Sequence, residues 1–296
     1  MKTIALKFEK YQSNGNDFVL IDEDRNPDLT EAMRKALSRV LMDRLRSVGA
    51  DSVLFLKRER AGIRYRVYEE GIELEMCGNG LCCAAHYMRT AGGKNLRAFI
   101  TKGGVHRSVA GSGELFTADL GVLRPVRSYL RRQVDASALM IGLAALVPGR
   151  SSAAVFRRMG IRIEDGFFVN PSEAHVVFLV NEASAVDLAK VGDYVGRLTD
   201  VFPEGANVNL CQRIDGRTVR IRTYERGKFK ETLACGTGSA ASAYVAKSVF
   251  GLRVRTVRVR NTGGDVLIRF HGKKMFLTGP AVRVFHGTIN VSLPRG

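Results

Sequence analysis

The stretch Thr232-Leu-Ala-Cys-Gly-Thr-Gly-Ser-Ala-Ala241 places a cysteine at the start of a predicted helix. Gly236 and Gly238 favour a tight turn, and the alanine-rich residues that follow are strong helix formers. The first N–H groups of a helix have no partner within the helix and lie at the positive end of its dipole. We therefore expect the turn to bind an anion and to lower the pKa of the Cys235 thiol.

A second turn of the same kind lies in the first third of the chain, at Met76-Cys-Gly-Asn-Gly-Leu-Cys-Cys-Ala-Ala85. The predicted order around each turn is the same: two strands, a helix, two strands, the Cys-Gly turn with its helix, and three short strands. This duplication predicts an α+β fold of two similar, pseudo-symmetric lobes. We assign residues 1–123 to the N-terminal lobe and 124–279 to the C-terminal lobe, with 280–296 returning to the first.

Two of the predicted elements belong to the second copy of this order, and one segment lies outside the repeat. The apolar spacing predicts a helix at Ser184–Leu198, and the alternation of arginines predicts one strand through Arg253, Arg255, Arg258 and Arg260. The connector at about 124–160 has no counterpart in the first lobe, and within it residues 128–147 are expected to be helical. We assign no function to this connector.

The bulk composition limits the class of protein. A chain of 296 residues suits two domains, and five cysteines, an odd number, indicate a reducing cytoplasm rather than a disulfide framework. The start of the chain reads as a strand without a secretory segment, and no apolar run is long enough for a bilayer. The net charge of +17 would suit a nucleic acid or a membrane surface. Because the arginines are dispersed and accompany no binding motif, a solvated arginine-rich exterior is favoured.

The paired turns suggest one reaction. If two opposed helix N-termini hold the carboxylate of an amino acid, they also stabilise the enolate-like anion that forms when the α-proton leaves. One cysteine would remove this proton as a thiolate, and the other would return one to the opposite face. Cys77 and Cys235 are the candidates. We expect no cofactor and no metal, since the histidines are scattered and the spacing is not that of a zinc site. The other cysteines, Cys82, Cys83 and Cys211, are expected to be buried apolar residues.

Six segments, spread over nearly the whole chain, then resemble one family. They are Ser13-Asn-Gly-Asn-Asp-Phe18, Val48-Gly-Ala-Asp51, Met76-Cys-Gly-Asn-Gly80, Asn207-Val-Asn209, Tyr224-Glu-Arg-Gly227 and Glu231-Thr-Leu-Ala-Cys-Gly-Thr-Gly238. In this order they resemble the diaminopimelate epimerases, amino-acid epimerases of lysine and peptidoglycan biosynthesis that use no pyridoxal phosphate. The resemblance implies their fold, in which each lobe is a curved, mostly antiparallel sheet or barrel around a central helix. It also implies the conversion of LL- to meso-diaminopimelate. It also implies an amino acid as the small-molecule partner. We allow for a homodimer, and expect neither a membrane nor a nucleic acid as a partner.

The resemblance also implies roles for individual residues. Cys77 and Cys235 would form the acid–base pair, with the reacting carboxylate on the backbone amides of Gly78, Asn79, Gly236 and Thr237. The substrate-binding residues would be Asn16, Asn207, Glu225, Arg226 and His175. Of these, Arg226 would hold the distal carboxylate, and His175 and Glu225 would lie near the reacting amine. As isolated residues, Glu225 and Arg226 could equally be a surface ion pair, and His175 a structural histidine.

Three positions depart from the family pattern and bear on the substrate. Tyr68 and Glu173 stand where the family has asparagine, and Ser52 stands where it has glutamine. The asparagine positions normally help to hold the distal end of diaminopimelate. A phenol and an anion there could favour a basic side chain, whereas Arg226 still suits a distal carboxylate. Three hypotheses remain: a diaminopimelate epimerase, a racemase of another amino acid on the same scaffold, and a non-catalytic or nucleic-acid-binding relative.

Overall fold

A computed structural model describes residues 2–92, 96–110, 113–124, 137–147, 149–171 and 173–293. The chain divides into two compact units. Unit 1 contains Met1–Asp119 and Thr278–Gly296, and unit 2 contains Leu120–Leu277. Each is a mixed sheet with helices packed on it.

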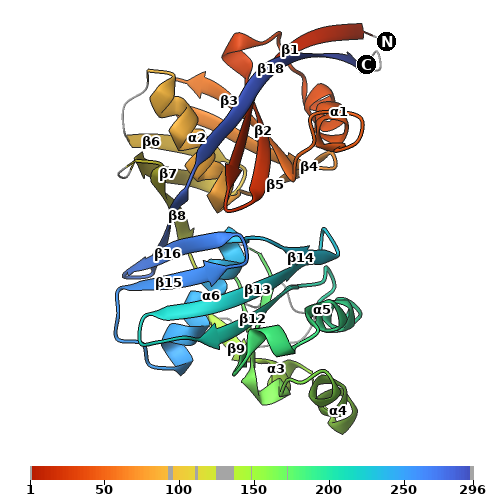
Figure 1. Ribbon diagram of the computed structural model, residues 1–296, viewed down its shortest axis with the longest axis vertical. Coiled ribbons are helices and arrows are strands. Elements are labelled where there is room, and N and C mark those ends of the chain that lie inside the picture. The colour runs from red at the N-terminus through yellow and green to blue at the C-terminus, as the bar shows by residue number, and fades with distance from the viewer. Residues whose placement is uncertain are drawn as a thin grey trace. The chain divides into compact units, whose positions relative to one another are not determined.

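Unit 1 contains two main helices and the strands at both ends of the chain. Its elements are β1 (Lys2–Ser13), β2 (Asn16–Asp22), η1 (Glu23–Arg25), α1 (Glu31–Met42), β3 (Ser52–Glu59), β4 (Gly62–Glu69), β5 (Ile72–Leu74), α2 (Gly78–Thr90), β6 (Leu96–Thr101), β7 (Gly104–Ala110), most of β8 (Leu115–Val122) and β18 (Val282–Leu293). β1 pairs with β2 and, along nearly its whole length, with β18. Figure 1 shows β18 beside β1, although the two strands come from opposite ends of the chain.

Unit 2 is built from one continuous stretch. Its elements are β9 (Met140–Gly142), α3 (Leu143–Leu146), α4 (Arg150–Arg158), η3 (Ile163–Asp165), β10 (Gly166–Val169), β11 (His175–Val180), η4 (Ala183–Ala185), α5 (Leu188–Gly196), β12 (Asn207–Arg213), β13 (Thr218–Glu225), β14 (Lys230–Thr232), α6 (Gly236–Val249), β15 (Thr256–Asn261), β16 (Gly264–His271) and part of β17 (Lys274–Pro280).

The same strand pairing occurs in both units. In unit 1, β2 and β3 are parallel, β3 and β4 antiparallel, β4 pairs antiparallel with β5 and parallel with β6, and β6 and β7 are antiparallel. In unit 2, β11, β12, β13, β14, β15 and β16 repeat this pattern in the same order. The helix pair α1 and α2 corresponds to α5 and α6. The duplication expected from the sequence is therefore present in the hydrogen-bonding pattern as well.

The sheet of unit 1 is covered on both faces, which fixes what each strand residue contacts. Val19 and Ile21 of β2 pack with Leu37 and Leu41 of α1 in one apolar cluster. Successive strand residues point to opposite faces, so the residues between them point toward α2. Asp22, for example, accepts a hydrogen bond from the Tyr87 hydroxyl of α2 at 2.6 Å. The alternation along each strand therefore tells which of its residues point toward α1 and which toward α2.

The second glycine of each Cys-Gly-x-Gly turn is needed for close packing. A Cβ on Gly80 would lie 2.4 Å from the Tyr65 hydroxyl, and one on Gly238 would lie 2.5 Å from the Asn209 Oδ1. The first turns of α2 and α6 are fully buried against strands that carry these side chains. Glycine at this position lets the helix N-terminus approach the sheet, so that its free N–H groups lie next to strand residues.

Three predicted elements differ in the structure. Residues 183–185 form the short helix η4, and α5 begins only after Asp187, whose side chain caps it by accepting from the Lys190 N–H. β15 begins at Thr256, so Arg253 and Arg255 precede the strand. In the connector, residues 125–136 lie outside the described part of the chain. Residues 140–142 form a strand paired with β10 rather than helix, because this edge of the sheet offers a partner to the backbone. Helix is present at Leu143–Leu146, within the expected range.

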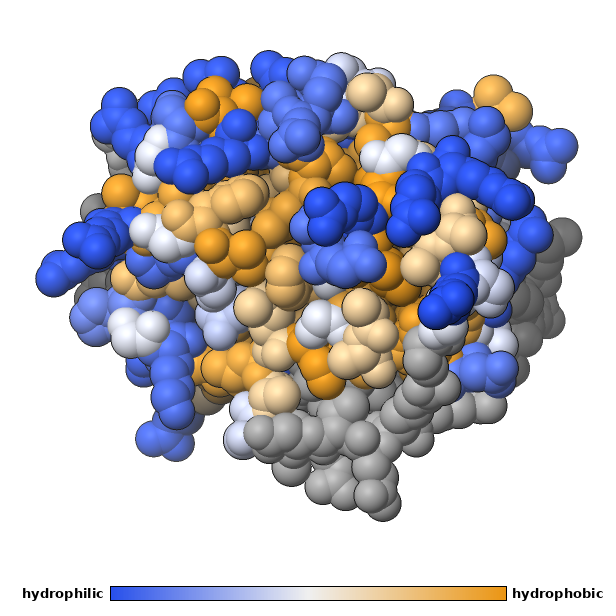
Figure 2. Space-filling view, turned by 90° about the horizontal axis from the view of Figure 1, so that it is seen from below, coloured by the Kyte–Doolittle hydropathy of each residue, from blue (hydrophilic) through white to orange (hydrophobic). Residues whose placement is uncertain are grey.

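The arginines of β15 lie on the outward face of the strand. On β15, Arg258 and Arg260 are exposed while the intervening Val257 and Val259 are buried. Figure 2, seen from below, shows hydrophilic residues toward the edges of the visible face and apolar residues toward its middle. None of the helices in the described ranges is long and apolar enough to cross a membrane.

Candidate active site

Cys77 caps the N-terminus of α2 in unit 1. Its backbone is extended, with φ −135° and ψ 121°, and its sulfur accepts a hydrogen bond from the Gly80 N–H at 3.4 Å. The thiol thereby takes the place that a serine or aspartate side chain usually occupies at a helix N-cap. The sulfur lies at the positive end of the helix dipole.

Cys235 has the same arrangement at the N-terminus of α6 in unit 2. Its φ and ψ are −126° and 118°, and its sulfur accepts from the Gly238 N–H at 3.3 Å. The Thr237 hydroxyl lies 3.4 Å from the same sulfur. The two cysteines therefore have equal local geometry, each within its own unit.

The electrostatics at Cys235 differ from the expectation of a lowered pKa. Burial raises the pKa of the Cys235 thiol well above its usual value, and the nearby carboxylates of Glu225 and Glu173 raise it further. The hydrogen bonds from Thr237 and Gly238 act in the opposite direction but do not outweigh these effects. The helix N-terminus is only one part of the field at this sulfur. The cysteine is a thiol in this arrangement.

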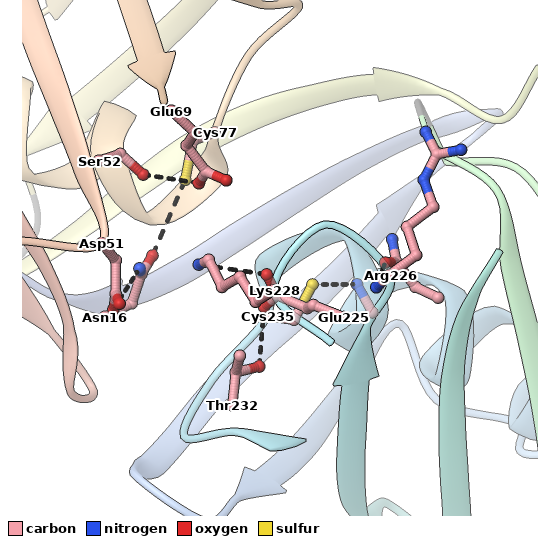
Figure 3. A network of polar contacts seen from close by, with 12 residues as sticks. Asn16, Asp51, Ser52, Glu69, Cys77, Glu225, Arg226, Lys228, Thr232 and Cys235 are labelled. Atoms are coloured by element: carbon pink, nitrogen blue, oxygen red, sulfur yellow. Dashed lines mark hydrogen bonds and ion pairs between the residues drawn. The ribbon is translucent and has the colours of Figure 1, made fainter. Parts of the chain in front are cut away.

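In unit 1, Asn16 is fixed between Cys77 and Asp51. Its Nδ2 donates to Asp51 Oδ2 at 3.2 Å, which turns its Oδ1 toward α2. That oxygen accepts from Asn79 Nδ2 at 3.3 Å and from the Cys77 thiol at 3.9 Å. Figure 3 shows Asn16 between Asp51 and Cys77. The acceptor that faces the Cys77 thiol is therefore oriented by Asp51.

A charge cluster holds Asp51 and the preceding turn in place. Lys10 is buried and forms an ion pair with Asp17 at 2.6 Å. Arg44 contacts both Asp17, at 2.6 Å, and Asp51, at 3.0 Å. Burial alone would raise the pKa of Asp17, but the hydrogen bonds from Arg44 and Lys10 lower it to about 2. The cluster supports Asn16 through Asp51.

In unit 2, a chain of hydrogen bonds leads to the sulfur of Cys235. Thr223 donates to Asn209 Oδ1 at 2.9 Å, and Asn209 Nδ2 lies 3.0 Å from His175 Nδ1. Because this amide donates, Nδ1 of His175 accepts and Nε2 carries the proton toward the Thr237 hydroxyl at 3.0 Å. The Thr237 hydroxyl, which accepts from Nε2, has its own proton available for the sulfur of Cys235 at 3.4 Å.

His175 is a neutral member of this chain. It is fully buried, and burial together with the charge of Arg226 lowers the pKa of His175 to about 3. An uncharged imidazole with both nitrogens engaged positions its neighbours and does not supply a proton at neutral pH. The side chain that faces the sulfur of Cys235 is a hydrogen-bond donor, whereas the one that faces the sulfur of Cys77 is an acceptor.

The remaining predicted residues of unit 2 gather around Cys235, with one exception. Asn207 donates to Glu173 Oε2 at 3.0 Å and accepts from the Arg226 backbone N–H at 3.0 Å. Glu225 accepts from the Thr232 hydroxyl at 2.7 Å and pairs with Lys228 at 3.2 Å. The Arg226 guanidinium instead contacts the carbonyls of Glu204 and Gly205, and Figure 3 shows it pointing away from Cys235.

In unit 1, Glu69 and not Tyr68 lies on the face of β4 that is turned toward the cysteine. Tyr68 is fully buried in the cluster on the α1 face, where it packs edge-on against Phe55. Glu69, one residue later, points to the opposite face and accepts from the Ser52 hydroxyl at 2.8 Å. Figure 3 shows both side chains by Cys77. Of the three positions that depart from the family pattern, Ser52 and Glu173 therefore lie near a cysteine in their units, while Tyr68 does not.

The cysteines assigned to the core are buried in the structure. Burial raises the pKa of Cys82 and of Cys211 to about 12, and raises that of Cys83 well above its usual value. None of the three lies at a helix N-terminus, because Cys82 and Cys83 lie within α2 and Cys211 lies within β12. This leaves the two N-cap cysteines as the candidates for chemistry.

The sequence matches the family model for diaminopimelate epimerase over residues 8–122 and 167–284. The chain belongs to the diaminopimelate epimerase family. A diaminopimelate epimerase of Methanocella arvoryzae is 35% identical over 291 residues, which cover 97% of each chain. One of Chromobacterium violaceum is 35% identical over 297 residues, which cover 97% of this chain and all of the relative. The chain is therefore an isomerase of this family, whose substrates are amino acids.

Solved structures show the same fold at low sequence identity. A PhzF-family phenazine biosynthesis protein of Bacillus anthracis has a TM-score of 0.69 at 16% identity, covering 98% of this chain and 99% of its own. A hydroxyproline epimerase of Agrobacterium vitis has a TM-score of 0.64 at 12% identity, covering 98% and 92%. The prediction of two α+β lobes with the diaminopimelate epimerase fold is thus confirmed.

Proposed function

We propose that the chain is a cofactor-independent epimerase that converts LL-diaminopimelate to meso-diaminopimelate with Cys77 and Cys235 as its acid and base. The observation that carries the proposal is the paired geometry: each cysteine caps a buried helix, and each sulfur accepts from the N–H three residues later. Relatives named diaminopimelate epimerase that align over nearly the full chain support the choice of substrate.

Over one turnover the substrate loses one proton and gains one, and so does the pair of cysteines. One cysteine, as a thiolate, takes the α-proton and breaks the Cα–H bond, and the electron pair moves toward the substrate carboxylate. The thiol of the other cysteine then protonates the opposite face of the carbon and becomes the thiolate. The free N–H groups at the starts of α2 and α6 (Gly78, Asn79, Gly236 and Thr237) would bind the carboxylate, whose charge grows in the transition state.

The surroundings of the sulfurs suggest that Cys235 becomes the base once substrate has bound. Cys77 faces the Asn16 acceptor, whereas Cys235 faces the Thr237 donor, which favours the thiolate. The carboxylates of Glu225 and Glu173 oppose this second effect. A substrate ammonium placed beside them would offset their charge and make the Cys235 thiolate accessible once substrate has bound.

The proposal is tested by exchange in heavy water. Under reducing conditions, either stereoisomer of diaminopimelate should acquire deuterium at one α-carbon, detected by proton NMR or mass spectrometry. Cys77→Ser and Cys235→Ser should each lose activity by at least about 100-fold, since a serine hydroxyl is a far weaker acid and base partner. Wild-type protein that incorporates no deuterium would refute the proposal.

A racemase of another, basic amino acid is the second candidate. Two observations favour it: Glu173 adds negative charge near Cys235, and Arg226 directs its guanidinium to backbone carbonyls. Exchange measured over a panel of amino acids decides between the two candidates. Faster exchange on lysine, ornithine, arginine or histidine than on diaminopimelate would favour the second.

A further inference from the structure

The chain repeats a short motif that the family resemblance assigns in only one of the two units. Tyr68-Glu-Glu-Gly71 at the end of β4 corresponds to Tyr224-Glu-Arg-Gly227 at the end of β13. The registers agree: Val53 of β3 lies opposite Tyr68, and Val208 of β12 lies opposite Tyr224. Glu69 is therefore the structural equivalent of Glu225.

The two tyrosines confirm the equivalence through their packing. Tyr68 is buried in the apolar cluster on the α1 face, and Tyr224 is buried against α5, where its hydroxyl donates to Asp193 at 2.5 Å. With the tyrosine fixed on one face, the following glutamate in each strand must point to the face of the Cys-Gly helix. On that face Tyr65 donates to the Cys77 carbonyl at 3.4 Å.

The side chain of Glu69 is held in a defined position. Ser52 lies opposite it on β3 and donates to its Oε1 at 2.8 Å. The neighbouring start of α2 contains a second polar feature, since the Oδ1 of the buried Asn79 has no hydrogen-bond partner among the described residues. A carboxylate and a buried amide oxygen at one helix start are both acceptors, which suits a ligand that donates hydrogen bonds.

We propose that Glu69, held by Ser52, binds an ammonium group on the side chain of the substrate and so selects diamino acids. This inference rests on the proposed function. In the proposed reaction, the pseudo-symmetry that relates the two Cys-Gly turns also relates the two faces of the α-carbon. The carboxylate, bound by both turns, keeps its place under this operation. The same operation swaps the directions of the α-ammonium and the side chain. If Glu225 binds the α-ammonium, its equivalent Glu69 lies toward the side chain.

The chemistry of the contact defines the substrate class. A carboxylate that accepts from an ammonium forms a charge-assisted hydrogen bond, which is stronger than one between neutral groups. The substrate therefore carries a second amino group in addition to the one on the reacting carbon. Diaminopimelate and lysine have such a group, whereas 2-aminopimelate has both carboxylates of diaminopimelate but only one amine.

The test compares these substrates in the wild type and in Glu69→Gln. The measured quantity is the ratio of kcat/KM for α-deuterium exchange on diaminopimelate to that on 2-aminopimelate. The wild type should prefer diaminopimelate, and Glu69→Gln should lower the ratio roughly 10- to 100-fold, as expected for loss of a charge-assisted hydrogen bond. Ser52→Ala should lower it in the same direction by a smaller factor.

Glu31→Gln is the matched control, because Glu31 is an exposed residue of α1 that pairs only with Lys35 among the described groups. It should keep the wild-type ratio. Thermal unfolding of each variant shows whether the fold is retained. If Glu69→Gln does not fold, Glu69→Asp takes its place, because it keeps the carboxylate on a side chain that is one methylene shorter. A ratio within twofold of wild type in Glu69→Gln overturns the inference. Wild-type protein inactive on every substrate overturns the proposed function itself.

Discussion

Replacing Thr237 by valine tests the hydrogen-bond chain at Cys235. Valine matches threonine in shape but removes the hydroxyl that lies 3.4 Å from the sulfur and 3.0 Å from His175 Nε2. The Gly238 N–H remains as a donor to the sulfur at 3.3 Å. The variant therefore removes one of two donors that stabilise the thiolate, while the cysteine stays at the helix N-terminus.

The expected change in the pKa of Cys235 follows from the charge on its thiolate, which is the hydrogen-bond acceptor. A hydrogen bond to a charged group contributes about 1.5–3 kcal/mol, and a pKa unit corresponds to about 1.4 kcal/mol. Losing a donor to the charged form raises the pKa of Cys235, by about 1–2 units. The rising limb of kcat/KM against pH should therefore move to higher pH by this amount. At pH 8, kcat/KM should fall about 10- to 100-fold.

The assay is α-deuterium exchange on diaminopimelate, measured from pH 6 to pH 10. Thr237→Ser is the control, since it keeps the hydroxyl and loses only a methyl group. Its pH profile should stay close to that of the wild type. The reasoning fails if the rising limb of Thr237→Val does not move, or if the serine variant moves as far as the valine variant.

Two further predictions concern stability. Because hydrogen bonds lower the folded-state pKa of Asp17 from 3.8 to about 2, its stabilisation is complete above pH 4 and is lost as the pH falls to about 2. Arg44→Ala should therefore lower the free energy of unfolding by about 1–2 kcal/mol at pH 7 and by less at pH 2, as chemical denaturation at the two values will show. Gly80→Ala, whose Cβ would lie 2.4 Å from the Tyr65 hydroxyl, should destabilise the fold by about 1–3 kcal/mol. Adding Tyr65→Phe should recover part of that loss in thermal unfolding, and a double variant no more stable than Gly80→Ala would contradict the steric explanation.

The fold could be predicted from the sequence because its strongest local signals occur twice. The Cys-Gly-x-Gly turn marks the starts of α2 and α6 through glycine and helix propensity, and both are short-range properties. The helix predicted at Ser184–Leu198 begins later than expected because Asp187 caps it. That signal was present in the sequence, since aspartate is a favoured N-cap residue. The strand at residues 140–142 depends on a partner strand, which short-range patterns do not reveal.

Two properties of the candidate site were not predicted, for different reasons. The raised pKa of Cys235 depends on burial and on Glu173, which lies on another segment, so the local turn could not indicate it. The position of Glu69 could have been found from sequence. Comparison with the family pattern pointed to Tyr68, but the repeat of Tyr-Glu-x-Gly, together with strand alternation, places the next residue beside the cysteine helix.

The pairing of β1 with β18 has a consequence for how the protein is made. Unit 2 is a continuous stretch of chain that is complete once Leu277 has left the ribosome, whereas unit 1 lacks β18 until residues 282–293 have followed. Until then the outer edge of β1 exposes unpaired backbone groups, a common starting point for aggregation. Nascent chains that stall before Val282 would thus contain a finished second half and an unfinished first half. They are the species most in need of a chaperone.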